Sequence, residues 1–263
     1  MLLTIQIVNY NSRDNLRTCL QSIQENVSNC ENIQIIVINN DEKKLENIPD
    51  KLRIELIEKN ENIGFGKAHN LGFRIAKGEY ILILNPDTKI FPLTIEKLLD
   101  AFSVDEKIGI IGPAFMGEKG ISEEEYFGLR KTPLSMIWMK ILCRKKLESE
   151  NIFETDWVSG GAMMIKKDLF SELGGFDENY FMYFEDVDLC LRAQKKGWKI
   201  AVHPKAKIFH KSGQSFSDSR KKKKYYYDSQ IYYIKKNFGL FWAWIVKILR
   251  IPFYVQNVYY KKR

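Results

Sequence analysis

Short apolar runs alternate with stretches of helical periodicity through the first hundred residues of the chain. Four runs are β-branched and have the length of buried strands: Leu3–Val8, Ile33–Ile38, Ile54–Ile57 and Tyr80–Leu84. Three stretches between or after them have helical spacing or a helical start: Leu16–Ile23, Gly66–Ala76 and Pro92–Phe102. This alternation predicts an α/β fold with a mostly parallel central sheet and helices on both faces.

Polar segments follow three of these predicted strands, at Asn9–Ser12, Asn39–Asp41 and Asn85–Thr88. In open α/β sheets, ligands bind outside the carboxyl ends of the strands, where the strand order reverses. We therefore expect the three segments to meet at one edge of the sheet and to form part of a ligand site.

The second half of the chain continues the alternation less regularly. Trp157–Ile165 is predicted to be a strand, Lys167–Leu173 and Glu185–Lys196 are predicted helices, and Lys199–Val202 and Ile208–Phe209 are predicted closing strands. The stretch 113–156, which holds the acidic run Glu123–Glu125 and the apolar patch Leu134–Leu142, has no clear period and is expected to pass over the site as a variable excursion.

The 263-residue chain has a net charge of +8, but this charge is unevenly distributed along the sequence. Residues 205–263 carry a net +13, whereas residues 1–204 carry −5. We expect a domain over 1–216, with a nucleotide-binding half (1–112) and an acceptor and catalytic half (113–216), followed by a basic, aromatic, helical tail over 217–263.

Two interpretations of this tail remain open. Leu240–Val246, with Trp242 and Trp244, is too short to span a bilayer, yet aromatic residues flanked by lysine and arginine are typical of an interfacial segment on anionic lipid. Alternatively, the tail is a helix that packs its aromatic face on the domain while its lysines are solvated. The segment RKKKKYYY also allows a nucleic-acid interpretation, which the acidic body does not favour.

The remaining composition points to a cytoplasmic protein. The four cysteines, Cys19, Cys30, Cys143 and Cys190, show neither zinc-site nor CxxC spacing and are expected to be reduced thiols. The beginning of the chain, MLLTIQIVNYNS, lacks the pattern of a signal peptide.

Three motifs carry candidate chemistry. In Asn85-Pro86-Asp87-Thr88, a carboxylate on a stiff turn at the end of a strand suits Mg²⁺ or Mn²⁺ shared with substrate phosphates, although the same residues also favour an ordinary turn. In the segment 62–72, Gly64 and Gly66 open a helix that favours an anion, but His69 stands where a dinucleotide fingerprint has its third glycine.

The third motif has three carboxylates in four residues, Glu185, Asp186 and Asp188, framed by aromatic side chains. Repulsion and partial burial can tune one of them as a general base, whereas stabilisation of a helix start is the structural alternative. Asp188 and Arg192 lie four residues apart, which predicts an ion pair on the helix.

In this order, the motifs resemble the family 2 glycosyltransferases of the nucleotide-diphospho-sugar transferase (GT-A, Rossmann-like) fold, and most closely their bacterial rhamnosyltransferase-like branch. The resemblance covers about residues 3–216 and is carried by IVNYNS, INND, NIGFGKAHNLG, LNPDT, WVSGGAMMIKK, GGFDENYFMYFEDVDLCLRA and a later His210.

The resemblance implies a role for each matching residue. Nucleotide binding falls to Val8, Tyr10, Asn39, Gly64, Asn70 and Asn85, with Asn39 standing where the family commonly has an aspartate. Asp87 takes the metal, with His210 as a second ligand in some members, and the first acid of the family's Asp-x-Asp is replaced by Asn85. Asp186 is the catalytic base beside Glu185, and Trp157, Gly160 and Gly161 line the donor and acceptor site.

The implied activity is an inverting, metal-dependent transfer of a sugar from a nucleoside diphosphate to a hydroxyl of a glycan or lipid-linked saccharide, in cell-surface polysaccharide synthesis. Rhamnose from dTDP is the first expectation, and galactose, glucose or N-acetylhexosamine from UDP is the alternative. A non-catalytic nucleotide-sugar-binding or nucleic-acid-binding protein is the alternative of another class. We expect the protein to be cytoplasmic and to bind peripherally at the inner face of the cell membrane.

Overall fold

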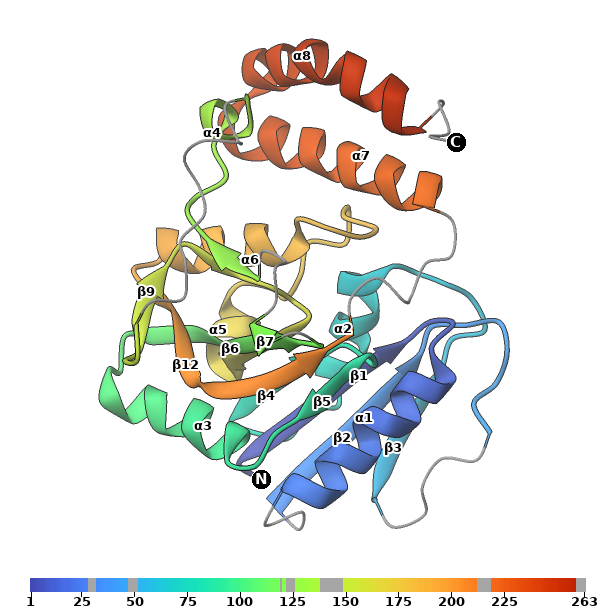
Figure 1. Cartoon of the computed structure of the whole chain (residues 1–263), viewed down its shortest axis with the longest axis vertical. Coiled ribbons are helices and arrows are strands. Elements are labelled where there is room, and N and C mark those ends of the chain that lie inside the picture. The colour runs from blue at the N-terminus through green and yellow to red at the C-terminus, as the bar shows by residue number, and fades with distance from the viewer. Residues whose placement is uncertain are drawn as a thin grey trace.

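A computed structural model of the chain describes residues 1–27, 32–46, 52–118, 120–121, 126–137, 149–211 and 219–258. An open sheet with flanking helices forms the lower body of the molecule, and two long C-terminal helices lie above it (Figure 1). Cys30, Cys143, Glu123–Glu125 and much of the predicted apolar patch Leu134–Leu142 lie outside the described residues, whereas Cys19 and Cys190 are buried free thiols.

The four strands predicted first form one parallel half of the sheet. They are β1 (Leu3–Asn9), β2 (Ile33–Asn39), β3 (Ile54–Glu58) and β4 (Tyr80–Leu84), in the spatial order β3-β2-β1-β4. Every residue of β1 is buried, because helices cover both faces of this half. The predicted α/β architecture is confirmed, and the polar ends of β1, β2 and β4 point to the same edge.

The other half of the sheet mixes strand directions. Beyond β4 the order continues with β11 (Ala162–Lys166), β6 (Ile108–Gly117), β12 (Lys199–His210) and β5 (Thr88–Ile90), of which β6 and β12 pair in parallel. The two predicted closing strands are therefore one strand, β12, with a register irregularity between His203 and Lys207.

The predicted strand Trp157–Ile165 is divided in two. A turn at Ser159–Gly161 separates β10 (Trp157–Val158) from β11, and the Ala162 N–H donates to the Ser159 carbonyl at 3.2 Å. After the end of β6, the described residues of the excursion form short elements: β7 (Gly120–Ile121), β8 (Phe127–Gly128), α4 (Pro133–Ile137) and β9 (Phe153–Thr155).

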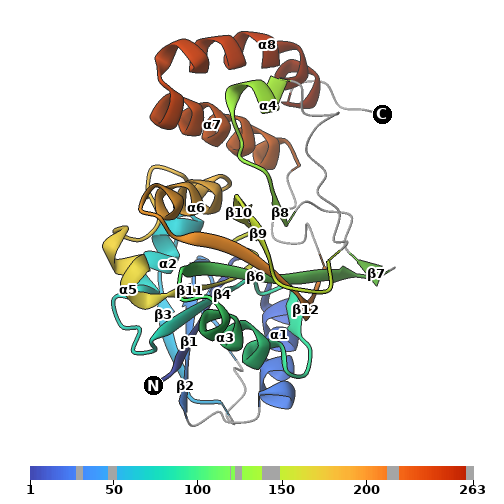
Figure 2. The same cartoon turned by 90° about the vertical axis from the view of Figure 1, so that its left-hand side faces the viewer.

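Helices cover both faces of the sheet, as predicted. On one face lie α1 (Arg13–Asn26) and α3 (Thr94–Val104), and on the other lie α2 (Phe65–Phe73), α5 (Lys167–Glu172) and α6 (Glu185–Lys195) (Figure 2). On α2, His69 is a core residue: its ring centre lies 4.5 Å from that of Phe65, and burial lowers its pKa to about 3.

The C-terminal tail is a helical hairpin of α7 (Ser219–Phe238) and α8 (Leu240–Val258), and α7 packs on the body. Tyr233 and Ile234 of α7 are fully buried, and the Tyr233 ring centre lies 5.4 Å from that of Phe184. The packing interpretation of the tail therefore holds for α7. Within the described residues, neither helix has the length and apolarity needed to cross a bilayer.

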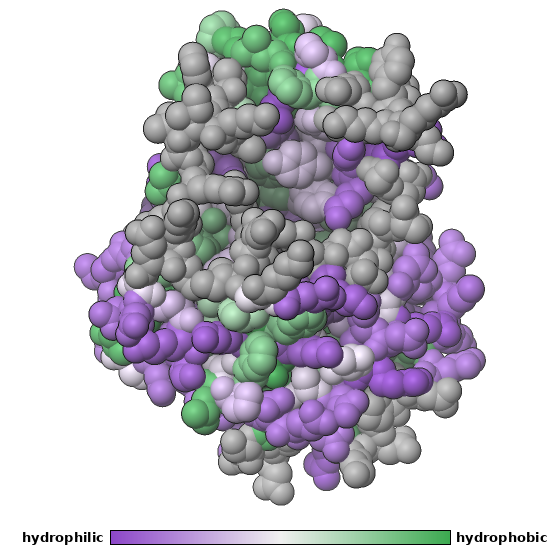
Figure 3. All heavy atoms as spheres, viewed as in Figure 1, coloured by the Kyte–Doolittle hydropathy of each residue, from purple (hydrophilic) through white to green (hydrophobic). Residues whose placement is uncertain are grey.

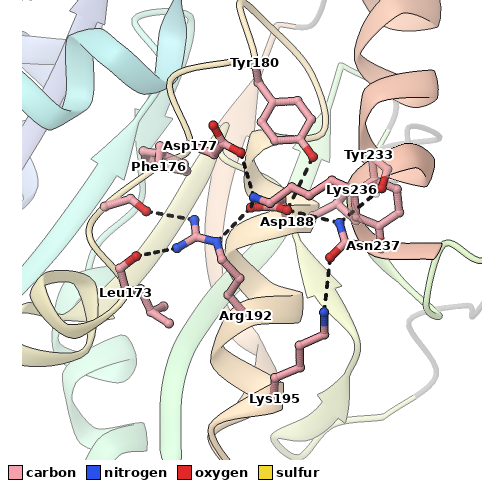
Figure 4. Close-up of polar contacts among 12 residues, drawn as sticks. Leu173, Phe176, Asp177, Tyr180, Asp188, Arg192, Lys195, Tyr233, Lys236 and Asn237 are labelled. Carbon is pink, nitrogen blue, oxygen red and sulfur yellow. Dashed lines mark hydrogen bonds and ion pairs between the residues drawn. The ribbon is translucent and has the colours of Figure 1, made fainter. Parts of the chain in front are cut away.

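An ion cluster fastens α7 to the body (Figure 4). The fully buried Asp188 on α6 accepts from Arg192 Nε at 2.8 Å, from Lys236 Nζ at 2.8 Å and from Asn237 Nδ2 at 3.2 Å. Lys236 Nζ also donates to Asp177 Oδ2 at 2.7 Å, and Arg192 donates to the carbonyls of the loop after α5. The predicted Asp188–Arg192 pair is thus confirmed, and it belongs to a larger cluster that joins α6, α7 and two loops.

The same cluster sets the ionisation of Asp177. Burial raises the pKa of Asp177, but hydrogen bonds from Lys236 and Asn179 outweigh that effect and lower it to about 2. Because the folded pKa lies below the ordinary value near 4, the ionised carboxylate stabilises the fold above about pH 4, and this stabilisation is lost as the pH falls towards 2.

Lys236→Met tests the role of this cluster in stability. We expect it to lower the free energy of unfolding by about 2 kcal/mol at pH 7, less than the roughly 3–5 kcal/mol for a fully broken buried pair because Arg192 still compensates Asp188. The control Lys235→Met, at the exposed neighbouring residue, is expected to change the free energy of unfolding by less than about 0.5 kcal/mol.

Urea unfolding at several pH values measures both variants. The difference between the wild type and Lys236→Met is expected to narrow as the pH falls from about 4 towards 2, because Asp177 becomes protonated. Equal stability at pH 7, or a difference that stays constant through this range, would contradict the role given to Lys236.

Candidate active site

A cavity of about 470 Å³ opens where the carboxyl ends of the strands, the β10–β11 turn, the start of α6 and the side of α7 come together. Eleven of the thirteen site residues predicted from the sequence line it: Val8, Tyr10, Gly64, Asn85, Asp87, Trp157, Gly160, Gly161, Glu185, Asp186 and His210. The structure therefore brings together residues that lie up to about two hundred positions apart in the chain.

Asn39 and Asn70 do not line the cavity. Asn39 is fully buried, accepting from Asn9 Nδ2 at 2.8 Å and donating to Glu58 Oε2 at 2.6 Å, so its amide holds the ends of β1, β2 and β3 together. Asn70 exchanges two 2.9 Å hydrogen bonds with the backbone of Phe176 and thereby fixes the loop before α6 on α2. Both residues hold elements that border the cavity, and their role as nucleotide contacts stays a prediction.

Asn40, the next residue after Asn39, lines the cavity instead. Its Oδ1 accepts from the Ile63 N–H at 3.0 Å and its Nδ2 donates to Asn62 Oδ1 at 2.9 Å, which fastens the glycine loop to the end of β2. Gly64 has φ +92°, and a Cβ there would lie 2.7 Å from the Phe181 carbonyl oxygen, so the position requires glycine.

The amides at the start of α2 are already in use. The Gly64 N–H donates to Asn62 Oδ1 at 3.0 Å, and the Phe65 N–H donates to the Phe181 carbonyl at 3.0 Å. The glycine motif therefore lines the site chiefly as a tight turn, and these two N–H groups do not point to a bound anion.

Asp186 is held in the cavity by backbone amides. Its Oδ2 accepts from the Gly160 N–H at 2.9 Å and its Oδ1 accepts from the Val187 N–H at 2.8 Å. Burial raises the pKa of Asp186, and the two N–H groups oppose that rise because they stabilise the charged form. Its carboxylate is thus fixed in direction by two separate elements, the β10–β11 turn and α6.

Glu185 beside it is more deeply buried. Its Oε2 has no hydrogen-bond partner among the described residues, and burial together with the charge of Asp186 raises its pKa well above the usual range. The two adjacent carboxyl groups therefore differ in pKa, and that of Glu185 is raised further. Glu185 favours the protonated form, and Asp186 is the member better able to stay ionised and accept a proton.

The backbone that leads into this pair is strained. Tyr183 and Phe184 both have positive φ, +71° and +68°, immediately before α6 begins at Glu185. Such non-glycine conformations persist only where the surroundings hold them, and α7 supplies contacts: the Tyr226 ring centre lies 5.6 Å from that of Tyr183 and 5.3 Å from that of Phe184.

Asp87 and His210 form the second polar group of the cavity. Antiparallel pairing of β5 with β12 sets His210 opposite Thr88, which brings His210 Nε2 to 3.4 Å from Asp87 Oδ1. Asp87 Oδ1 is buried and accepts no hydrogen bond from the described residues. A carboxylate oxygen beside an imidazole nitrogen fits a divalent metal that keeps most of its shell for water and phosphate oxygens.

Within the described parts of the chain, no cluster of three or more His, Cys, Asp or Glu side chains has the geometry of a metal site. Asp87 and His210 are the two candidate protein ligands at this position. This number agrees with the sites of Mg²⁺, which substrate phosphates commonly complete.

Among the lining residues that were not predicted from the sequence, besides Asn40, are Lys131, Lys222 and Tyr226. Lys131 is nearly buried, with its Nζ 4.8 Å from the ring centre of Trp157, and it lies in the excursion whose pattern is unreadable. Lys222 and Tyr226 come from α7. Their only sequence signal is the basic and aromatic run itself, which indicates charge and stacking without indicating a cavity.

Comparison with known sequences decides the family. The sequence model described as glycosyl transferase family 2 matches residues 4–174, and one described as the N-terminal domain of galactosyltransferase matches residues 145–212. The first match covers well over half of the chain. The chain belongs to glycosyl transferase family 2.

Three relatives of this family 2 chain are named as rhamnosyltransferases. An N-acetylglucosaminyl-diphospho-decaprenol L-rhamnosyltransferase of Mycobacterium tuberculosis is 29% identical over 62% of this chain and 60% of the relative. Rhamnosyltransferase WbbL of Escherichia coli is 29% identical over 60% of this chain and 63% of the relative, and dTDP-rhamnosyl transferase RfbF of Shigella flexneri is 27% identical over 79% and 68%. The predicted rhamnosyltransferase-like resemblance is confirmed, and the chain spans about 60% of the length of the first of these relatives.

Solved structures confirm the GT-A fold. GalNAc-T7 with UDP, GalNAc and Mn²⁺ superposes with a TM-score of 0.68 at 15% identity, covering 89% of this chain and 48% of that one. The mannosyltransferase PcManGT of Pyrobaculum calidifontis, with GDP-Man and Mn²⁺, superposes with a TM-score of 0.61 at 14% identity over 98% and 69%.

Asp186→Asn tests whether Asp186 is the general base. The amide keeps the size of the side chain but cannot take a proton, so sugar transfer is expected to fall at least about 100-fold while donor binding changes little. Glu185→Gln, which resembles a protonated glutamate, is expected to cost less than Asp186→Asn.

Initial rates of transfer with saturating donor, together with calorimetric donor binding, measure these effects. Asp168→Asn, an exposed acid on α5, is the matched control and is expected to keep wild-type rates. Near-normal turnover of Asp186→Asn would exclude Asp186 as the base.

Proposed function

We propose that this protein is an inverting, metal-dependent glycosyltransferase. It moves a sugar from a nucleoside diphosphate to a hydroxyl of a glycan or lipid-linked saccharide during synthesis of a cell-surface polysaccharide. One observation carries the proposal: a single cavity holds both a metal-type pair, Asp87 and His210, and a carboxylate fixed by two backbone amides, Asp186.

dTDP-rhamnose is the donor that we place first. Support comes from three relatives that are named as rhamnosyltransferases, one of which is named as a dTDP-rhamnosyl transferase. A UDP-linked hexose or N-acetylhexosamine is the second candidate, because UDP occupies the related structure of GalNAc-T7. The buried Asn39 leaves Asn40, Val8 and Tyr10 as the polar and apolar contacts for a base at this edge of the sheet.

Asp87 and His210 would hold the divalent metal, Mn²⁺ or Mg²⁺. When bound, the metal supplies positive charge that stabilises the departing diphosphate. Asp87 is nearly buried, so its charge acts in a medium that screens little and gains from a bound cation.

Asp186 accepts the proton of the acceptor hydroxyl as that oxygen attacks the anomeric carbon. The new carbon–oxygen bond forms on the face opposite the diphosphate, and the bond from the anomeric carbon to the diphosphate oxygen breaks, so the configuration inverts in one displacement. The two amides that fix Asp186 remove the need to reorient the base during the reaction, which contributes to the rate through positioning.

A nucleic-acid-binding function is less well supported. The tyrosines of the basic run face the body: the Tyr225 ring centre lies 4.5 Å from that of Phe181, and Tyr226 packs on Tyr183 and Phe184. Stacking on bases needs a free ring face, which these contacts restrict. We therefore expect no nucleic-acid partner.

Removal of metal tests the metal-dependent part of the proposal. EDTA is expected to abolish transfer, and Mn²⁺ or Mg²⁺ to restore it. Asp87→Ala is expected to weaken metal-dependent binding of nucleoside diphosphate at least about tenfold, because the nearly buried carboxylate is lost, whereas Asp100→Asn on the exposed side of α3 is expected to have no effect. Titration calorimetry with and without metal measures nucleoside diphosphate binding by both variants. Full transfer activity in the presence of chelator would contradict metal dependence.

The acceptor is proposed to be lipid-linked and to be met at the inner face of the cell membrane. Large apolar side chains gather on the outer side of α8, and Figure 3 shows them at the end of the molecule beyond α7; among them are Leu240, Phe241, Trp244, Ile248 and Phe253. Phe241 and Trp244 are 71% and 64% exposed. Together with the basic run that begins α7, this surface is typical of a peripheral segment on anionic lipid.

Vesicle binding tests this surface. Full-length protein is expected to sediment with phosphatidylglycerol vesicles at low salt and to be released at high salt. The pair Phe241→Ser and Trp244→Ser is expected to weaken binding at least about tenfold, whereas Val104→Ser, at an equally exposed apolar residue on α3, is expected to leave it unchanged. Equal sedimentation of both variants, or none by the wild type, would contradict the proposal.

A further inference from the structure

The C-terminal helix α7 forms one wall of the active-site cavity. Lys222 and Tyr226 line the same cavity as Asp186 and Asp87. Both α7 residues lie beyond the segments 4–174 and 145–212 that the two family models match. This wall is therefore a feature of this chain that the family assignment does not explain.

The wall is held firmly in place. Ser229 Oγ donates to the Met182 carbonyl at 2.8 Å, the Tyr226 ring packs on the segment before α6, and Lys236 joins Asp188 and Asp177 at the other end of the helix. Contacts at both ends and in the middle of α7 fix its direction relative to Asp186. The position of Lys222 against the cavity is thus built into the fold.

Lys222 differs from the other basic residues around it. Lys221, Lys223 and Lys224 are exposed, whereas Lys222 is half-buried and lines the cavity. No carboxylate among the described residues forms an ion pair with Lys222, and Asp186 in the same cavity wall has its two oxygens on backbone amides. An ammonium group on a cavity wall without such a partner indicates an anionic ligand.

We propose that Lys222 binds the diphosphate of a lipid-linked acceptor, an inference that rests on the proposed transferase function. The donor diphosphate is assigned to Asp87 and His210 at the sheet edge, while Lys222 lies on the helix that α8 covers (Figure 1). Because α8 packs on α7 and exposes its apolar side, Lys222 lies on the hairpin that is proposed to meet lipid, where the hydrocarbon chain of such an acceptor would remain. Lys222 thereby orients the saccharide so that its hydroxyl faces Asp186.

Two soluble probes distinguish the two sources of diphosphate. Farnesyl diphosphate represents the acceptor anchor, and dTDP or UDP with Mn²⁺ represents the donor; both are titrated into the full chain without vesicles. Lys222→Gln is expected to weaken binding of farnesyl diphosphate about tenfold and to leave nucleotide binding within about twofold. Lys222→Arg is expected to keep most of the binding of farnesyl diphosphate. The matched control Lys224→Gln is expected to change neither farnesyl diphosphate binding nor nucleotide binding.

Each other outcome contradicts the inference. If Lys222→Gln weakened only nucleotide binding, Lys222 would be assigned to the donor diphosphate. If Lys222→Gln weakened binding of uncharged farnesol as much as binding of farnesyl diphosphate, the charge of Lys222 would not be involved. Wild-type protein that binds nucleotide with Mn²⁺ but not farnesyl diphosphate would overturn this inference and leave the transferase proposal standing. Failure of the nucleotide itself to bind would overturn the transferase proposal. Thermal unfolding of each variant confirms that the fold is intact.

Discussion

The first turn of α6 carries two carboxylates with different tasks, and the rest of the site depends on that division. Residues two positions apart on a helix point to nearly opposite sides, so Asp186 faces the cavity while Asp188 faces α7. Asp186 is held by the amides of Gly160 and Val187, and Asp188 is compensated by Arg192 and Lys236. One helical turn thus fixes both the proposed base, Asp186, and the residue that anchors α7, Asp188.

This arrangement makes α7 of the C-terminal hairpin part of the candidate active site. The cluster around Asp188 holds α7 against the strained residues Tyr183 and Phe184, and α7 in turn supplies Lys222 to the cavity. A chain that ended after Tyr227 would lose the buried Tyr233 and the lysine of the cluster. The basic, aromatic composition of the tail therefore serves two purposes: α7 packs on the body, and α8 exposes its apolar side.

The parallel half of the sheet was predictable because its strands are continuous apolar runs that helices cover on both faces. Asp186 and Asp87 each allowed an ordinary structural explanation on their own; the family resemblance placed them in one site, and both line the cavity. The approach of Asp87 to His210 was not derivable from spacing, since it depends on the pairing of β5 with β12 across about 120 residues. Asn39 and Asn40 show the same limit at short range, because successive residues point to opposite sides of a strand end and the sequence does not say which one faces the cavity.

The central claim is that this cavity binds a nucleotide sugar between Asp87 and Asp186. A crystal structure with dTDP-rhamnose or a UDP-sugar and Mn²⁺, using the anomalous signal of manganese, tests it most directly. The account predicts a manganese peak in contact with Asp87 and with the diphosphate, and the anomeric carbon of the sugar turned towards Asp186. A nucleotide or manganese peak bound elsewhere on the chain, or a sugar directed away from Asp186, would contradict it.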